Sequence, residues 1–477
     1  MERSSGILTP LFSLPNAQGI GTLGKCAFDF ADFVRECGCR YWQVLPLHPT
    51  GYGDSPYQSF STFAGNPYFI DLEDLVELGL LDKSELPDFP AGAVDYGRQF
   101  REKIGLLKRA YARSDFLARE VQAFSDRHYA DWLRDYALFM CLKEDFGGSW
   151  RDWEPWARDR GDPQVYLLVD RYLHEEGFWV FVQYLFFRQF GALSAHLKKI
   201  GLKLIGDVPI YLATDSADVW ANREIFRFRG SNPVAVAGVP PDAFSADGQR
   251  WGNPLYRWDV LKKRGYDWWV RRVKHLSEMY DVLRLDHFRG FERYYAVPAD
   301  AETAREGRWE KGPGEDLFRA LPAVPMIAED LGMITPEVRA LRDRLNLPGM
   351  NVLQFAFDAN ARDSVYLPHN HRKNSVSYLG THDNDTLLGW LDGLSPADRA
   401  YFKSYCGGTD RDAAFRTLFA SPSDLVIVTI QDALGMREGR INTPARAAGN
   451  WTFRLADDGY RRETKFLREL NRTFSRG

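Results

Sequence analysis

The stretch VLRLDHFRG, at Val282–Gly290, is the part of the sequence from which we derive the fold. Apolar residues occupy three of its first four positions, which is typical of a short buried strand. Arg284 and Asp286 stand two residues apart, so on a strand their side chains point to the same face. A neighbouring cation lowers the pKa of a carboxyl group, and an ionised, firmly held carboxylate can act as a nucleophile. The same two residues are also compatible with a structural ion pair.

The composition is that of a globular protein. The chain has 477 residues, of which 45% are hydrophobic and 26% charged, so one large decorated domain or two to three smaller ones are possible. The net charge is −4 and no long basic run occurs, which argues against nucleic acid as a main partner. Aromatic residues reach 14%, and part of that surplus suits a groove that binds sugar faces or other flat apolar surfaces.

The cysteines and the N-terminus indicate a cytoplasmic protein. The 5 cysteines show no zinc-binding spacing, so free thiols in a reducing cytosol are the plainest interpretation. The start, MERSSGILTP, lacks a basic segment followed by an apolar run, so we expect no signal peptide. The most apolar window, Phe178–Phe187, is far shorter than the roughly 20 residues of a membrane span, and we expect no membrane partner.

Strand and helix patterns alternate along the chain and predict an α/β fold. Helices are expected around Ala27–Val34, over Phe178–Ile200 and over Trp268–Met279. Eight strands are expected: Gly6–Phe12, Tyr41–Leu47, Lys203–Val208, Val282–Asp286, Pro325–Glu329, Met350–Phe355, Val376–Leu379 and Leu425–Ile430. Eight strands separated by helical or inserted segments predict a (β/α)8 TIM barrel.

Two segments interrupt the alternation, and we expect both to be insertions. Residues 71–170 carry helical stripes and predict a helical insertion. Residues 209–270 are rich in Gly and Pro and predict a loop-rich insertion, with the loop Gly238–Pro254 inside it. No internal repeat or linker divides the chain, so we expect residues 1–477 to form a single barrel with these insertions.

Carboxylates follow several of the predicted strands, at the barrel face where chemistry occurs. The polar residues at these ends are Asp207, Asp286, Glu329, Asp330, His382, Asp383, Asp385, Gln431 and Asp432. A helix N-cap or a dipole partner is the alternative for any one of them, and it carries most weight for Asp330 and Asp432.

Two of these carboxyl groups have contrasting surroundings. Asp286 has the cation Arg284 beside it, whereas Glu329 follows three apolar residues, where desolvation would raise its pKa. Glycoside chemistry needs such a pair, because one carboxylate attacks the anomeric carbon while the other, protonated, donates to the leaving oxygen. Asp383, with His382, could hydrogen-bond sugar hydroxyls.

Two polar loops carry aromatic residues that suit sugar binding. Ser55 and Tyr57 lie in PTGYGDSPYQSFSTFAGNP, and Asp242, Phe244 and Trp251 lie in the loop Gly238–Pro254. The alternative for Tyr57 and Trp251 is a hydrophobic plug that holds each loop down. The HxH of His369 and His371 lacks a third ligand, so we expect no metal, and no phosphate-binding P-loop occurs.

At these residues the sequence resembles the 4-alpha-glucanotransferases (amylomaltase, or disproportionating enzyme), a family of the alpha-amylase superfamily. The resemblance lies in PTGYGDSPYQSFSTFAGNP, GDVPIYLATDSADVW, AGVPPDAFSADGQRWGNPLY, LRLDHFRG, IAEDLG, GTHDNDT and INTP…GNW. It implies a (β/α)8 barrel with inserted subdomains and no C-terminal β-sandwich. It also implies retaining transfer between α-1,4-glucan donors and acceptors through a covalent glucosyl–enzyme, without a cofactor, by a monomer or homodimer.

The resemblance implies a role for each matching residue. Asp286 would be the nucleophile, Glu329 the acid and then the base, and Asp383 the residue that stabilises the transition state. The residues implied to bind substrate are Arg284, His382 and Asp207 at the cleavage point, Ser55 and Asn442 on the donor side, and Trp251 on the acceptor side. Two residues depart from the pattern: Ala243, where many members carry an aromatic residue, and Ala445, where Gly is usual.

Three other functions are weighed against this one. An alpha-glucan hydrolase shares the covalent intermediate and differs only in what attacks it. A non-catalytic glucan-binding barrel is disfavoured because Asp286, Glu329 and Asp383 are all present. An enzyme of phosphorylated metabolites would need a phosphate site after the last strands, and the region after Ile430 has no Gly-rich candidate.

Overall fold

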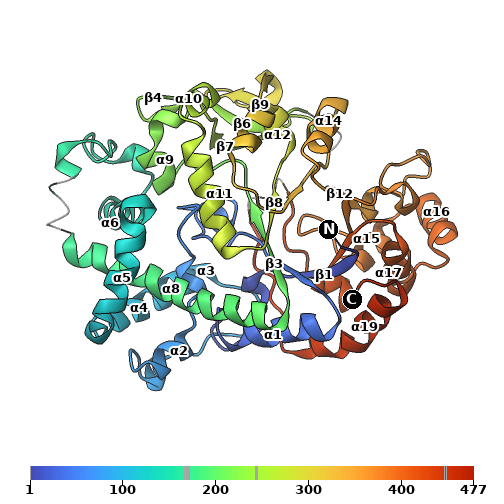
Figure 1. Ribbon diagram of the computed structural model, residues 1–477, viewed down its shortest axis with the longest axis horizontal. Coiled ribbons are helices and arrows are strands. Elements are labelled where there is room, and N and C mark those ends of the chain that lie inside the picture. Colours follow the sequence, from blue (N-terminus) through green and yellow to red (C-terminus); the bar gives the residue numbers. More distant parts are fainter. Residues whose placement is uncertain (1, 166, 168–171, 242–244, 445, 447) are drawn as a thin grey trace.

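A closed barrel of parallel strands forms the centre of the molecule (Figure 1). The computed structural model describes residues 2–477 except 166, 168–171, 242–244, 445 and 447. Within these residues the eight barrel strands are β1 (Ser4–Leu8), β2 (Tyr41–Gln43), β3 (Lys203–Val208), β8 (Val282–Leu285), β11 (Met326–Ala328), β12 (Gly349–Val352), β13 (Ser375–Tyr378) and β14 (Leu425–Thr429). They pair in chain order, and β1 closes the ring against β14. The eight predicted strands and the predicted (β/α)8 barrel are confirmed.

Helices follow the strands and cover the outside of the barrel. These helices are α1 (Lys25–Glu36), α8 (Leu173–Ile200), α11 (Asp267–Met279), α13 (Glu315–Ala320), α14 (Pro336–Arg344), α15 (Leu387–Gly393), α16 (Pro396–Cys406), α17 (Arg411–Ala420), α18 (Ile430–Ala433) and α19 (Thr464–Thr473). The three predicted helices correspond to α1, α8 and α11. Gly201 ends α8 with φ +69°, a left-handed conformation that glycine adopts without strain.

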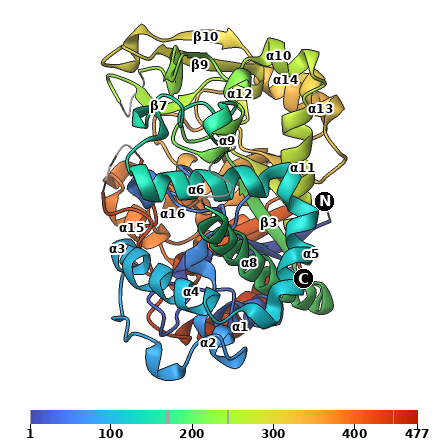
Figure 2. The same cartoon turned by 90° about the vertical axis from the view of Figure 1, so that its left-hand side faces the viewer.

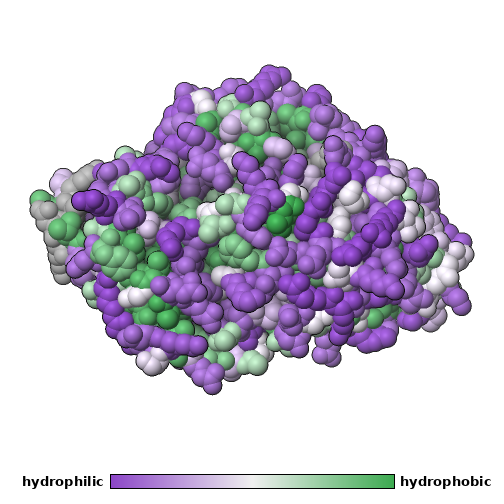
Figure 3. Space-filling model, turned by 60° about the horizontal axis from the view of Figure 1, so that its bottom comes forward, coloured by the Kyte–Doolittle hydropathy of each residue, from purple (hydrophilic) through white to green (hydrophobic). Residues whose placement is uncertain are grey.

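The segment between β2 and α8 is helical, and its helices gather on one side of the barrel. They are α2 (Leu72–Glu77), α3 (Tyr96–Arg98), α4 (Ile104–Tyr111), α5 (Ala118–His128) and α6 (Arg134–Phe146). Figure 2 shows α4, α5 and α6 around α8, on the side that lies at the left of Figure 1. The face in Figure 3 is largely hydrophilic, but hydrophobic residues gather at its left, on the same side as these helices.

A small antiparallel sheet stands apart from the barrel, at the top of Figure 1. Its strands, in spatial order, are β10 (Arg308–Lys311), β9 (Arg293–Pro298), β6 (Ala235–Val239) and β7 (Gln249–Pro254). The same region holds α9 (Ala217–Ala221), α10 (Trp258–Lys263), α12 (Arg289–Glu292) and the two-stranded ribbon of β4 (Phe228–Arg229) and β5 (Asn232–Pro233). The sequence pattern does not predict this sheet, because two of its strands, β9 and β10, come from residues beyond β8.

Residues from the two ends of the described chain lie together beneath the barrel. Arg476 is fully buried, and its guanidinium donates to the carbonyl oxygens of Ser4 and Ser423. Asn471 of α19 donates to the carbonyl of Cys37 and accepts from the hydroxyl of Ser5. These contacts seal the seam where β1 meets β14. Among the described helices, none combines the length and the apolar character that crossing a membrane requires.

Candidate active site

A cavity of about 400 Å³ opens at the carboxyl ends of the barrel strands. Several predicted site residues line it: Ser55, Tyr57, Trp251, Asp286, His382, Asp383 and Asn442. They come from the loops after β2, β13 and β14, from the end of β8 and from β7. The barrel therefore brings residues together that are up to several hundred positions apart in the chain.

Arg284 joins two carboxylates at the base of this cavity. Asp207 on β3 and Arg284 on β8 are register partners on neighbouring strands. Arg284 Nη1 lies 2.7 and 2.8 Å from the two oxygens of Asp207 and 2.9 Å from Asp286 Oδ1. Although burial opposes it, the negative charges of the two aspartates raise the pKa of Arg284 well above its usual value. The side chain of Asp207 is completely buried, whereas that of Asp286 keeps 30% of its surface exposed.

Glu329 follows β11 directly and is held by backbone N–H groups. Its Oε2 accepts a hydrogen bond from the backbone N–H of His287 at 2.7 Å, and its Oε1 accepts from Leu331 at 2.9 Å. Because His287 is the residue after Asp286, this hydrogen bond ties Glu329, at the end of β11, to the segment that follows β8. His287 adopts φ +50°, an uncommon conformation for a residue other than glycine.

The charge state of Glu329 differs from that of an ordinary glutamate. Burial raises the pKa of Glu329 to about 8, the negative charge of Asp286 adds to this effect, and the cation Arg284 opposes it. At neutral pH the carboxyl group is therefore largely protonated. Glu329 lies beside the cavity, behind His287, rather than in its lining.

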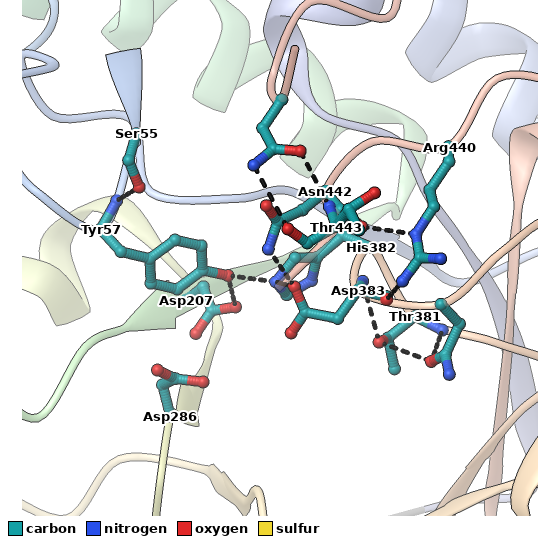
Figure 4. A network of polar contacts seen from close by, with 12 residues as sticks. Ser55, Tyr57, Asp207, Asp286, Thr381, His382, Asp383, Arg440, Asn442 and Thr443 are labelled. Atoms are coloured by element: carbon teal, nitrogen blue, oxygen red, sulfur yellow. Dashed lines mark hydrogen bonds and ion pairs between the residues drawn. The ribbon is translucent and has the colours of Figure 1, made fainter. Parts of the chain in front are cut away.

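Asp383 and His382 are fixed by the loop that follows β14. Asn442 donates from Nδ2 to Asp383 Oδ1 at 2.6 Å, and its backbone N–H donates to the carbonyl of His382 at 3.0 Å. Arg440 donates to the Asp383 carbonyl oxygen at 2.6 Å. Figure 4 shows this network, in which Asn442 contacts the carboxylate of Asp383.

Tyr57 connects Asp207 on β3 with His382 after β13. Its hydroxyl donates to Asp207 Oδ2 at 2.9 Å and lies 2.9 Å from His382 Nε2 (Figure 4). The rings of Tyr57 and His382 are nearly parallel, with centroids 5.4 Å apart. The backbone N–H of Tyr57 donates to the hydroxyl of Ser55 at 3.2 Å, which holds Ser55 at the cavity wall. The hydroxyl of Tyr57 is thus anchored in the polar network, so the residue does more than plug its loop.

Trp251 of β7 forms another wall. Its ring stands edge-on to that of His287, with centroids 4.9 Å apart, and its indole N–H donates to Gln249 at 3.1 Å. Burial lowers the pKa of His287 to about 4, against the charge of Asp286, so this imidazole is neutral. The predicted loop residues Asp242 and Phe244, and the departures Ala243 and Ala445, lie outside the described residues.

The remaining polar residues divide between site and scaffold. Asp330 pairs with Arg342 and accepts from the backbone N–H of Met350, and Asp432 accepts from the N–H of Leu387. Asp432 thus contacts the first residue of α15, as a dipole partner would, whereas Asp330 holds α14 and β12 and is neither an N-cap nor a dipole partner. His369 bonds to Tyr405, whereas His371 bonds to Ser377 and to a carbonyl oxygen, so they share no ligand site.

Sequence reasoning did not single out Trp451, which also lines the cavity. Its ring centroid lies 5.6 Å from that of Tyr57 and 6.0 Å from that of His382. Its backbone has φ +63°, and its N–H donates to the carbonyl of Ile441 at 2.8 Å. The GNW motif that contains it was a signal, but the sequence does not show that the segment folds back over the barrel.

The site can support acid and nucleophilic chemistry on one bond. It offers a carboxylate paired with a buried arginine, a protonated carboxyl group on the adjacent turn, and a third carboxylate on the opposite wall. Glycoside cleavage with a covalent intermediate uses such a pair.

Comparison with known proteins gives one consistent result. A family model described as 4-alpha-glucanotransferase matches residues 9–458. The curated 4-alpha-glucanotransferase of Thermus thermophilus is 48% identical over 477 residues, with 95% of each chain covered. That of Aquifex aeolicus is 42% identical, with 98% of each covered. An amylomaltase from Streptococcus agalactiae, solved in complex with acarbose, superposes with a TM-score of 0.96 at 35% identity, covering 100% of both chains.

Proposed function

The chain belongs to the 4-alpha-glucanotransferase family, with that family's transferase activity on α-glucans, and we propose that it acts by a retaining double displacement. The donor would be an α-1,4-glucan or maltooligosaccharide, and the acceptor a second such chain. The observation that carries the proposal is the hydrogen bond from the N–H of His287, the residue after Asp286, to Glu329. It ties a carboxyl group that sits beside a buried cation to one that is protonated.

In the first step, an oxygen of Asp286 attacks the anomeric carbon of the donor. The bond from that carbon to the leaving O4 breaks, and the proton of Glu329 moves to the leaving oxygen. The product is a β-linked glucosyl ester on Asp286 and a shortened glucan. Arg284, which pairs with Asp207 on the neighbouring strand, donates to Asp286 and thereby orients the nucleophile.

In the second step, the 4-hydroxyl of an acceptor glucan attacks the ester carbon. Glu329, now a carboxylate, takes the hydroxyl proton, and Asp286 is released. Two inversions restore the α configuration. Formation of the ester removes the charge of Asp286, and that charge is one cause of the raised pKa of Glu329. The ester therefore lowers this pKa and prepares Glu329 to act as a base.

The other residues would hold the sugar at the cleavage point. Asp383, fixed by Asn442, would accept hydrogen bonds from ring hydroxyls and stabilise the distorted transition state. His382 would contact the sugar at the cleavage point, Ser55 and Asn442 would bind the donor side, and Tyr57 would bind substrate beside them. Trp251, edge-on to His287, would stack against the acceptor.

Transfer rather than hydrolysis requires that a sugar and not water reaches the ester. Trp251 and the strand that carries it build a wall on the acceptor side, which supports transfer. An alpha-glucan hydrolase is the competing function.

We further propose that residues 71–170 and 209–270 form subdomains inserted into one barrel. The five cysteines are free thiols in the structure, which supports a cytoplasmic location, and the assembly would be a monomer or homodimer.

Product sizing from maltotriose alone tests transfer against hydrolysis. A transferase yields a ladder of longer and shorter oligomers with little gain in reducing ends. A steady rise in reducing ends without longer products would identify a hydrolase.

A second experiment tests the role of Glu329. In Glu329→Gln, the first turnover with maltotriose should slow about 10²- to 10⁴-fold, the usual contribution of general acid catalysis. Fluoride release from α-maltotriosyl fluoride should be nearly unaffected, because fluoride leaves with little protonation. Equal losses with both donors would exclude Glu329 as the acid.

A further inference from the structure

Arg289 is a buried arginine close to the reacting groups for which the proposed mechanism has no use. It stands three residues after Asp286 in the LRLDHFRG stretch and opens α12. Only 7% of the residue is exposed. Its charged side chain is therefore buried between the segment that follows Asp286 and the loop that follows Glu329, and that position calls for a physical explanation.

The contacts of Arg289 connect two loops and the small sheet. Its Nη1 donates to the carbonyl oxygen of Met333, in the loop that follows Glu329. Its guanidinium carbon lies 3.8 Å from the ring centroid of Trp309 on β10. Among the described residues, its Nε is buried and has no hydrogen-bond partner. The side chain is thus clamped between the sheet on one side and the Met333 loop on the other.

The Met333 loop determines where the carboxyl group of Glu329 points. Glu329 Oε1 accepts from the N–H of Leu331 in this loop, two residues before Met333. The backbone carbonyl of Glu329 accepts from the N–H of Phe288, the residue before Arg289. Any shift of the Met333 carbonyl would therefore move the Leu331 donor that orients the Glu329 carboxyl group.

We propose that Arg289 is a positioning residue that holds the Glu329 carboxyl group toward the leaving oxygen by fixing the Met333 carbonyl against Trp309. This inference rests on the proposed role of Glu329 as the acid. Arg289 itself touches no reacting atom. The charged and titratable groups that face Glu329 are Arg284 and Asp286 at the end of β8, and Tyr366 from the loop after β12. The arginine acts through backbone geometry and not through its charge.

The test compares two donors in the first turnover of Arg289→Met. The variant should release glucose from maltotriose about 10- to 100-fold more slowly, as expected when general acid catalysis is partly lost. Fluoride release from α-maltotriosyl fluoride should fall by less than about threefold, since that step needs little protonation. Arg289→Lys keeps a donor for Met333 and should recover part of the loss with maltotriose. Equal losses with both donors would overturn the proposal.

Arg272→Met is the matched control. Arg272 is also a buried arginine over tryptophan rings, 4.9 Å from the centroid of Trp269, but its Nε donates to Thr62, away from Glu329. It should affect both donors equally; a bias like that of Arg289→Met would show a general packing effect and overturn the proposal. If Arg289→Met fails to fold, Arg289→Lys carries the same comparison with a smaller bias.

Glu329→Gln, measured with the same two donors, separates the two proposals. If it slows only maltotriose while Arg289→Met slows both, the role of Arg289 is wrong and that of Glu329 stands. If Glu329→Gln slows both donors equally, the acid itself has been misassigned.

Discussion

Arg284 donates from one nitrogen to both Asp207 and Asp286, so a fully buried carboxylate and a partly exposed one share a single cation. Asp207 is fully buried, whereas Asp286 lines the cavity. The barrel therefore keeps a counter-charge beside the carboxyl group that we propose as the nucleophile. Asp207 in turn orients that counter-charge from the neighbouring strand.

Replacing Arg284 with Met should destabilise the fold and abolish activity. The variant leaves Asp207 buried without a cation, and breaking a buried ion pair in this way costs about 3–5 kcal/mol. Denaturant unfolding at pH 7 measures this loss. The double variant Asp207→Asn/Arg284→Met should recover much of the stability but none of the activity. Stability of the single variant within about 1 kcal/mol of the parent would contradict the pairing.

Asp286→Ala should remove nearly all activity while leaving the fold intact. The side chain is partly exposed, so its loss leaves no large cavity, but the nucleophile is gone. Loss of a covalent catalyst lowers turnover by on the order of 10⁴-fold or more. Maltotriose turnover and thermal unfolding check the two halves of the prediction. An active variant would show that another group attacks the sugar.

The alkaline limb of the pH profile should reflect the ionisation of Glu329. Because only its protonated form can donate, and burial raises its pKa to about 8, kcat/KM should be retained below about pH 8 and lost above it. Initial rates with maltotriose between pH 5 and 10 measure this limb.

The charge of Asp286 should be visible in the titration of Glu329. In Asp286→Asn that charge is absent, so the pKa of Glu329 should fall below its value in the parent chain. Carbon NMR of labelled glutamate reports the shift directly. A pKa of Glu329 that is equal or higher in the variant would rule out the proposed exchange of roles between acid and base.

Tyr57→Phe should weaken the site without disturbing the fold. The hydroxyl donates to Asp207, the ion-pair partner of Arg284, and contacts His382, and hydrogen bonds to groups of this kind contribute about 1.5–3 kcal/mol. We expect a decrease in kcat/KM of about 10- to 100-fold at that energy.

Trp251→Ala should instead raise the share of hydrolysis, because it opens the acceptor wall. Product sizing of both variants separates donor from acceptor effects.

Buried histidines should make the protein sensitive to acid. Burial lowers the pKa of His48 to about 3 and that of His275 and His371 to about 4. The unfolded chain takes up these protons near pH 6.5, whereas the folded chain does not. Stability is therefore full above about pH 6.5 and declines as the pH falls toward 4. His371→Asn should reduce the slope of unfolding free energy against pH by about one proton below pH 6.

Several barrel strands could be predicted because they are short apolar runs followed directly by polar residues. VLRL before Asp286 and MIA before Glu329 both show this pattern. The sheet of β6, β7, β9 and β10 could not, because β6 pairs with β9 across the whole of β8 and α11. The two strands of that pair are distant in sequence, so no local pattern indicates that they meet.

The carboxylates of the site could also be predicted, but their supports could not. Asp286, Glu329 and Asp383 follow strands, so topology alone brings them to one face. The N–H of His287 that holds Glu329 depends on a left-handed residue, and Trp451 depends on another. Backbone conformations of this kind leave no pattern in side-chain chemistry. Asp330 and Asp432 share the pattern of the catalytic residues and yet bind the scaffold.

The pairing of β1 with β14 has a consequence for how the chain matures during synthesis. β1 leaves the ribosome before the other barrel strands, but its partner on one edge comes from residues 425–429. Until then that edge carries unpaired backbone groups, which can recruit strands from other nascent chains. Slow synthesis or a shortage of chaperones should therefore yield aggregates of chains in which β1 is exposed and β14 has not yet paired with it. Arg476 can donate to the carbonyl of Ser4 only after this pairing is complete.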